Sequence, residues 1–316
     1  MGAKRNTNTF RSGYLKLHET GELSRRIVEL WERLKSCDIC PHRCQVNRLE
    51  NQKGKCRTGK KAVVSSFGPH FGEESPLVGR YGSGTIFLTN CNLSCIFCQN
   101  YDISHLGQGY EAGEEKIAEL MLSLQNMGCH NINFVTPTHA VPQIARALSY
   151  AVEQGLNVPL VYNSGGYDSV STLELLDGIF DIYMPDLKYS DNNIAQRYCI
   201  AKDYAKVARD AIKEMHRQVG DLVIDETGIA LRGLLIRHLI LPEDLAGTYD
   251  AMKFIAEELS KNTYVNIMDQ YRPCYRANEH PPLNRRITKD EFARAVKTAR
   301  EFGIERLDGP RSYRLL

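Results

Sequence analysis

The sequence lacks any apolar run long enough to cross a bilayer, and it has almost no net charge. Its 316 residues include 40 basic and 38 acidic side chains, which give a formal net charge of +2. A near-neutral balance argues against a protein that binds nucleic acid or a membrane surface through bulk charge. The missing apolar run argues against a membrane-spanning helix. The first residues also lack the apolar core of a signal peptide.

Cysteine, by contrast, is plentiful. The chain has ten cysteines, and seven of them lie between positions 37 and 98 in spacings typical of metal ligands. Without a secretion signal, metal ligation in a reducing cytoplasm is a better interpretation than disulfide bonding. The scattered Cys129, Cys199 and Cys274 are interpreted as core or incidental thiols.

The most informative motif is the run of eight residues that holds Cys91, Cys95 and Cys98, with the spacing C-x3-C-x2-C. These positions would share one face of a buried helix, but Asn92 and Ser94 are weak helix formers and favour a loop. A structural zinc ion needs four ligands, and no fourth is nearby. Three thiolates in one loop are suited to three irons of a [4Fe–4S] cluster and leave the fourth iron open for another ligand.

The spacing, together with Phe97 just before the last cysteine, resembles the radical S-adenosylmethionine (radical SAM) superfamily. The resemblance implies that the amino and carboxylate groups of SAM fill the open iron position and that Phe97 lies beside the adenine ring. It also implies that an external one-electron reductant, of flavodoxin or ferredoxin type, donates an electron to the cluster. SAM would then be cleaved to a 5′-deoxyadenosyl radical that abstracts a hydrogen atom.

Strand-like and helix-like segments alternate from residue 83 onward. Six strands are predicted, at residues 85–89, 131–135, 160–162, 182–184, 234–241 and 265–268. Helices are predicted at residues 117–127, 141–152, 173–176, 193–219, 249–259 and 288–302. This order predicts an α/β fold, a partial (β/α)6 TIM-like barrel with an N-terminal cysteine-rich metal-binding extension. Functional groups of such folds gather beyond the carboxyl ends of the strands, where the cysteine loop also lies.

The polar runs at these strand ends resemble the activating enzymes of glycyl-radical enzymes, typified by pyruvate formate-lyase activase. The resemblance implies that Lys188 helps to hold the SAM carboxylate and that Arg237 faces the SAM carboxylate or ribose. It also implies a monovalent-cation pocket lined by Asn163, Ser164, the backbone of Met184, and Asp186.

The chain departs from the activase pattern at two places. Activases carry a Gly-Gly-Glu-Pro run after the second strand, and here the run is Thr136-Pro137-Thr138. Threonine hydroxyls and free carbonyls are able to accept from an ammonium, but a charged acceptor is missing. Asn163 also stands where an activase has aspartate.

A second set of cysteines, Cys37, Cys40, Cys44 and Cys56, precedes the barrel with the spacing C-x2-C-x3-C-x11-C. Four thiolates in an irregular, glycine-containing segment predict a metal site, either zinc or an auxiliary [4Fe–4S] cluster. The predicted organisation is a metal-binding segment at residues 1–80, a radical SAM core at 81–275 and a C-terminal helical segment at 276–316.

Together these features predict a cytoplasmic radical SAM enzyme, resembling the activases, that abstracts hydrogen from a glycine of a protein or peptide or from another substrate. Its partner would then be a glycyl-radical enzyme or peptide. Two alternatives remain open. One is a non-catalytic iron–sulfur or metal-binding module, and the other is an RNA-modifying radical SAM enzyme, which the near-neutral charge disfavours.

Overall fold

The computed structural model of the chain describes residues 10–309. The first residues examined above for a signal peptide, and the end of the predicted C-terminal segment, lie outside the described residues. Across the described range, no helix combines the length and apolar character that crossing a membrane requires.

One mostly parallel sheet organises the molecule, and within residues 10–309 it contains nine strands. These are β1 (Ala62–His70), β2 (Ser83–Leu88), β3 (Tyr110–Ala112), β4 (Ile132–Val135), β5 (Leu160–Ser164), β6 (Ile182–Pro185), β7 (Val223–Ile224), β8 (Ala230–Leu239) and β9 (Tyr264–Met268). The order is β3-β1-β2-β4-β5-β6-β8-β7, and β9 pairs with β8. The six predicted strands correspond to β2, β4, β5, β6, β8 and β9, and each pairs in parallel with its neighbour. The predicted mixed α/β fold is therefore confirmed.

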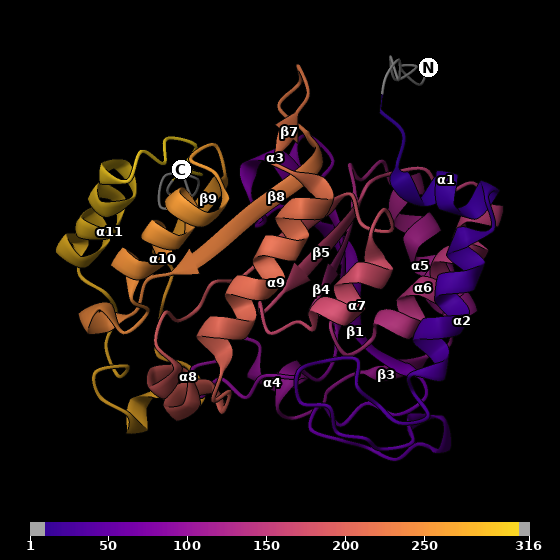
Figure 1. Cartoon of the computed structure of the whole chain (residues 1–316), viewed down its shortest axis with the longest axis horizontal. Coiled ribbons are helices and arrows are strands. Elements are labelled where there is room, and N and C mark those ends of the chain that lie inside the picture. Colours follow the sequence, from indigo (N-terminus) through magenta and orange to yellow (C-terminus); the bar gives the residue numbers. More distant parts are fainter. Residues whose placement is uncertain (1–9, 310–316) are drawn as a thin grey trace.

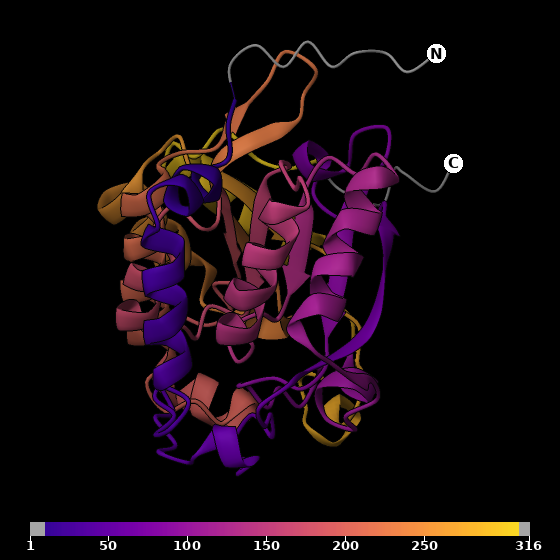
Figure 2. The ribbon, with the colours of Figure 1, turned by 90° about the vertical axis from the view of Figure 1, so that its right-hand side faces the viewer.

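Helices follow the strands and cover the sheet (Figures 1 and 2). They are α1 (Gly13–Glu19), α2 (Glu22–Glu32), α3 (Ser75–Val78), α4 (Tyr101–Ser104), α5 (Glu114–Asn126), α6 (Val141–Glu153), α7 (Val170–Leu173), α8 (Asn192–Cys199), α9 (Tyr204–Val219), α10 (Thr248–Phe254) and α11 (Lys289–Glu301). Single turns are η1 (Arg48–Glu50), η2 (Glu174–Leu176), η3 (Pro242–Asp244), η4 (Ile255–Leu259) and η5 (Ala277–Glu279).

Successive strand residues point to opposite faces of the sheet. Tyr162 and Tyr183 belong to the large core that the helices cover. Val161 and Ile182, one position earlier on each strand, belong to a smaller apolar cluster with Leu77 of α3. Because side chains repeat every second residue, Asn163 lies on the same face as Val161, above this smaller cluster.

Two details differ from the sequence-based prediction. The short strands β3 and β7 were not expected. The predicted helix over residues 193–219 is two helices, because Ile200 adopts a left-handed conformation with a φ of 58° and ends α8. The break directs α8 toward the cysteine loop, and α9 then runs back along the sheet.

The cysteine-rich segment before β1 lies at the same end of the molecule as α4 and α8 in both views (Figures 1 and 2). α8 follows β6, and α4 follows the loop after β2, so this end is the carboxyl edge of the parallel strands. The fold therefore gathers both sets of cysteines at the edge where α/β folds hold their ligands.

Candidate radical SAM site

The loop after β2 is irregular through the three cysteines. Asn90 turns the chain with a φ of 74°, and its N–H donates to the carbonyl of Ile103 at 3.0 Å. Within the loop, the backbone N–H groups of Ser94 and Ile96 donate to carbonyls near the end of α8. No helix spans residues 91–98, so the buried-helix alternative is excluded.

The three thiols share one electrostatic neighbourhood. Burial raises the pKa of Cys91 and of Cys98, and the charge of Cys95 raises both further. A hydrogen bond from Cys199 lowers the pKa of Cys95, and the nearby Lys188 ammonium lowers it as well. A cubane places each thiolate on a different iron, so this set of neighbouring thiols fits three of its corners.

Among residues 10–309, no three His, Cys, Asp or Glu side chains have the arrangement that a single metal ion requires. A cubane makes no such demand on its ligands, because its four irons are bound separately.

A buried charged network stands beside these thiols on the ends of β5, β6 and β8. Arg237 donates through Nε to Oδ1 of Asp186 at 2.8 Å and through Nη2 to Oδ1 of Asn163 at 2.6 Å. Lys188 donates to the other oxygen of Asp186. Four of the predicted cofactor-binding residues, two for SAM and two for the cation pocket, therefore form one connected group.

The charges in this network hold one another in the ionised state. Burial alone would raise the pKa of Asp186, but Arg237 and Lys188 hold it below its ordinary value. Burial alone would lower the pKa of Lys188, but Asp186 and the Cys95 thiolate raise it. Lys188 and Arg237 therefore both stay charged in a site of low dielectric. An anionic group of a ligand would be bound strongly there.

The side chain of Ser164 lies on the opposite face of β5 from that of Asn163. Its hydroxyl donates to Oδ2 of Asp168 at 2.6 Å, while Thr138 and Tyr162 donate to Oδ1 of the same carboxylate. The side chains of Ser164 and Asn163 therefore are not brought together, although the carbonyl of Ser164 accepts from the N–H of Asp186 at 2.9 Å.

Phe97 is buried between two tyrosines. Its ring lies 5.8 Å from that of Tyr271 and 6.4 Å from that of Tyr189, both edge-on. These contacts fix the ring beneath the cysteine loop, and its predicted place beside adenine stays a prediction.

Several residues near the site were not found from the sequence. Tyr204 of α9 lies with its hydroxyl 2.8 Å from the carbonyls of Gly165 and Asp186, and it accepts from the N–H of Lys188. It therefore ties two strand ends together. Cys199 was interpreted as a core or incidental thiol; the structure buries it in the core and also hydrogen-bonds it to Cys95.

Two glutamates approach the same network from the segment between β1 and β2. A carboxylate oxygen of Glu73 lies 4.0 Å from Nη1 of Arg237. Glu74 accepts from Nδ2 of Asn266, on β9, at 2.7 Å. Both carboxylates are buried. In the sequence they are two adjacent acidic residues before Ser75-Pro76, and they were not predicted because they do not follow any of the six predicted strands.

The second cysteine set surrounds a small cavity near the cysteine loop. The cavity is lined by Cys37, Ile39, Cys40, Cys44, Val46, Arg48, Gly54, Cys56 and His139. The four predicted metal-ligating thiols are therefore brought together. His139 closes one wall, and burial lowers its pKa to about 4.

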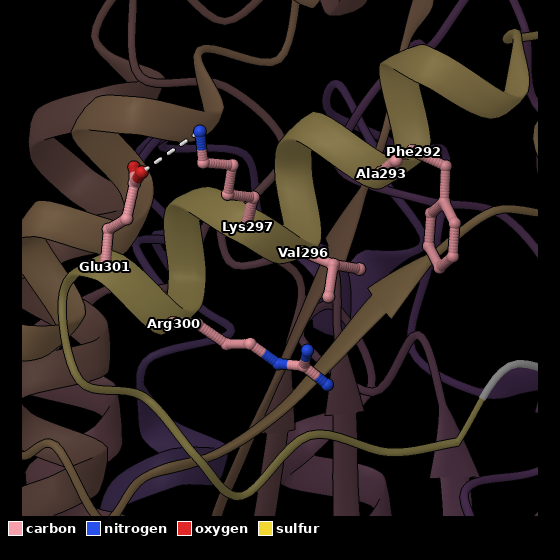
Figure 3. Close-up of a pocket in the computed structure, with 6 residues that line it drawn as sticks. All are labelled: Phe292, Ala293, Val296, Lys297, Arg300 and Glu301. Carbon is pink, nitrogen blue, oxygen red and sulfur yellow. Dashed lines mark ion pairs between the residues drawn. The ribbon is translucent and has the colours of Figure 1, made fainter.

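A different depression lies on the outer surface of α11. It is lined by Phe292, Ala293, Val296, Lys297, Arg300 and Glu301, and an ion pair joins Lys297 to Glu301 (Figure 3). All of these residues belong to one helix, and none of them is among the predicted site residues. We assign it no part in the site.

A parallel α/β sheet with a three-cysteine loop after its first parallel strand is the arrangement of a radical SAM protein. The radical SAM superfamily model matches residues 85–229 of the chain. The chain is also 36% identical over 281 residues to the uncharacterized protein MJ0674 of Methanocaldococcus jannaschii, an alignment that covers 86% of this chain and 76% of that protein. The chain belongs to the radical SAM superfamily. Membership implies an enzyme that uses a [4Fe–4S] cluster and SAM.

Proposed function

We propose that this enzyme cleaves SAM reductively and uses the resulting radical to abstract hydrogen from a glycine of a protein or peptide, in the manner of a glycyl-radical activase. When bound, the cluster supplies the electron that breaks the sulfonium bond of SAM and so yields a 5′-deoxyadenosyl radical. The electron would come from a flavodoxin- or ferredoxin-type partner in a reducing compartment such as the cytoplasm.

The observation that carries the proposal is the Asp186–Lys188–Arg237 network beside the thiols. Lys188 acts electrostatically on Cys95, Cys91 and Cys98, so its ammonium lies near the predicted cluster position. In this proposal Lys188 holds the SAM carboxylate and Arg237 faces the carboxylate or ribose. Both would bind an anionic group more strongly than they would in water.

Asp186 has a positioning role in this proposal. It accepts from both cations and so fixes the direction in which they present their remaining N–H groups. Asn163 and Asp186 would also offer oxygen ligands to a monovalent cation, together with the backbone carbonyls of Met184 and Ser164. Phe97 would lie against the adenine ring.

The test of SAM chemistry uses anaerobically reconstituted protein reduced with dithionite in the presence of SAM. We expect 5′-deoxyadenosine to accumulate in the wild type and to fall to the background level in Cys95→Ala, because that variant lacks one cluster ligand. Equal product in both proteins would contradict the proposal.

The substrate class needs a second measurement. A candidate glycyl-radical protein carrying deuterated glycine would be added to the same reaction. We expect deuterium in 5′-deoxyadenosine and a glycyl-radical signal in the electron paramagnetic resonance spectrum. Deuterium-free product with every glycine-labelled candidate would reject the activase-like substrate while leaving SAM cleavage intact.

A further inference from the structure

Four cysteines of the N-terminal segment line one cavity, together with two buried cationic or basic side chains. Three of these thiols, those of Cys37, Cys40 and Cys56, are buried. The N–H of Lys55 donates to Sγ of Cys44 at 3.3 Å, and a β-carbon at Gly54 would lie 2.7 Å from that sulfur. The backbone therefore approaches Cys44 closely, as it does where N–H groups stabilise a metal-bound thiolate.

Arg48 is the unusual member of this wall. Its side chain is among the largest fully buried ones, with 1% of the residue exposed. Nε donates to the carbonyl of Gly59 at 3.2 Å, and Nη1 lies 3.8 Å from Sγ of Cys37. Nη2 has no hydrogen-bond partner among the described residues. A buried guanidinium is costly unless a negative charge faces it.

His139 lines the same cavity but offers no donor to it, because its neutral ring carries the proton on the nitrogen that faces a carbonyl. Nε2 bonds to the carbonyl of Thr89 at 2.9 Å, while Nδ1, on a residue that is 1% exposed, has no partner within residues 10–309. Four neutral thiols would leave Arg48 without a counter-charge. Four thiolates around a [4Fe–4S] cluster carry net negative charge and accept hydrogen bonds.

We propose that Cys37, Cys40, Cys44 and Cys56 bind a [4Fe–4S] cluster, an anionic metal–thiolate centre that is stabilised by Arg48 and braces the loop of the SAM cluster. A [4Fe–4S] cluster binds its four thiolates on separate irons, whereas no three ligand side chains within residues 10–309 have the arrangement that a single zinc ion requires. The proposal concerns a different set of thiols from the one that the proposed function uses.

The bracing contacts join the two cysteine segments directly. His42, between Cys40 and Cys44, bonds through Nε2 to the carbonyl of Asn92 at 2.7 Å. Asn92 itself lies between Cys91 and Cys95. Nδ2 of Asn90 donates to the hydroxyl of Thr58 at 3.3 Å.

Further contacts support the far side of the cluster loop. Arg57, next to Cys56, donates to the carbonyls of Ser104 and His105, each at 2.6 Å. The hydroxyl of Ser104 shares a hydrogen bond with Sγ of Cys98 at 3.1 Å. Residues adjacent to ligands of the second centre therefore reach both ends of the cluster loop.

The N-terminal segment has little regular structure of its own, since η1 is the one helical turn that the structure describes between residues 36 and 60. Segments of this kind depend on metal binding for their conformation. Loss of the second centre should therefore loosen the wall that supports the SAM cluster.

The first test counts the metal in a protein that lacks the SAM cluster. In Cys91→Ala/Cys95→Ala/Cys98→Ala we expect four irons with four sulfides per chain after anaerobic purification with iron and zinc both supplied, and one zinc per chain in their place would overturn the cluster. Adding Cys37→Ser/Cys56→Ser should remove this metal, whereas adding Cys129→Ser, which changes a buried thiol outside both sets, should not. Metal-free protein before those additions, or unchanged metal after the Cys37/Cys56 change, would overturn the site whatever the outcome for SAM cleavage.

The second test concerns the brace. His42→Ala keeps all four thiols but loses the bond to Asn92, so we expect iron of the SAM cluster to be removed several-fold faster by a chelator. His42→Gln retains a donor and should restore the wild-type rate. Equal rates in all three proteins would show that the second centre does not support the cluster loop.

Discussion

Strand β6 has an aspartate just beyond each end, and the two have opposite environments. Asp181, at the amino end, accepts from the backbone N–H of Gly13 at 3.0 Å and of Leu160 at 3.2 Å. Burial raises its pKa to about 6. Asp186, at the carboxyl end, accepts from Arg237 and Lys188, which hold its pKa below the ordinary value against the effect of burial.

The comparison shows that the two edges of the sheet have different roles. At the amino edge a buried carboxylate ties α1 to the strands through backbone amides. At the carboxyl edge the second aspartate accepts hydrogen bonds from two cationic side chains beside the cysteine loop. This agrees with the general behaviour of parallel α/β folds, in which the carboxyl edge carries the chemistry and the amino edge the stability.

The largest expected effect comes from breaking the network at the carboxyl edge. Asp186→Asn would leave the buried cations of Lys188 and Arg237 without their shared carboxylate. We expect the free energy of unfolding in urea to fall by about 3–5 kcal/mol, the usual cost of removing one partner from a buried ion pair.

The matched control is Asp177→Asn, which removes an exposed carboxylate that pairs with Arg217 at 3.0 Å. An exposed pair contributes at most about 1 kcal/mol. Similar losses of unfolding free energy for the two variants would mean that the network at the carboxyl edge contributes no more to stability than an exposed ion pair.

The two edges also differ in how closely the backbone is packed. Replacing one glycine at each edge by alanine tests this difference. Gly166, after β5, has a φ of +79°, and a β-carbon there would lie 2.1 Å from the carbonyl oxygen of Asp186. Gly155, before β5, has a φ of +93°, and its β-carbon would meet nothing within 4 Å. Both replacements by alanine incur left-handed strain, but only the first one also displaces backbone.

We expect Gly155→Ala to lower the free energy of unfolding by about 1 kcal/mol. Gly166→Ala should lower it by about 3 kcal/mol, since overpacking adds to the strain. Chemical denaturation of both variants measures the difference. An equal loss would show that the turn at Gly166 shifts freely and is not held by Tyr204.

Sequence reasoning found the parts of the site that are local. The six parallel strands follow from short apolar runs, and Asp186, Lys188 and Arg237 were found because they come at or near the ends of such runs. The three-cysteine loop was recognised from its spacing and from Phe97 before the last cysteine. In each case the signal lies within about ten residues of the functional side chain.

The missed residues reach the site from distant parts of the chain. Glu73 meets Arg237 from the segment before β2, and Tyr204 meets Lys188 from α9. Cys199 contacts Cys95 because Ile200 ends α8 beside the cysteine loop. These contacts depend on how elements pack, which hydrophobic periodicity does not report. Arg48 was missed for the same reason, since a lone arginine in a cysteine-rich segment gives no sign of burial.

The last comparison concerns pH and the amino edge. Because the folded-state pKa of Asp181 is raised to about 6, the protonated carboxyl favours the folded state. Its contribution is complete below the unfolded pKa of about 4 and is lost as the pH rises through about 6. Wild type should therefore lose about 2 kcal/mol relative to Asp181→Asn between pH 4 and pH 7.

Urea unfolding of both proteins across this range measures the difference, in which the titration of other carboxylates cancels. The low pKa of Asp186 predicts the opposite sign at the other end of β6, where the carboxylate's contribution is lost as the pH falls below about 4. A pH-independent difference for Asp181→Asn would mean that its two backbone donors, and not burial, dominate its environment. Only the carboxyl end of the strand would then respond to pH.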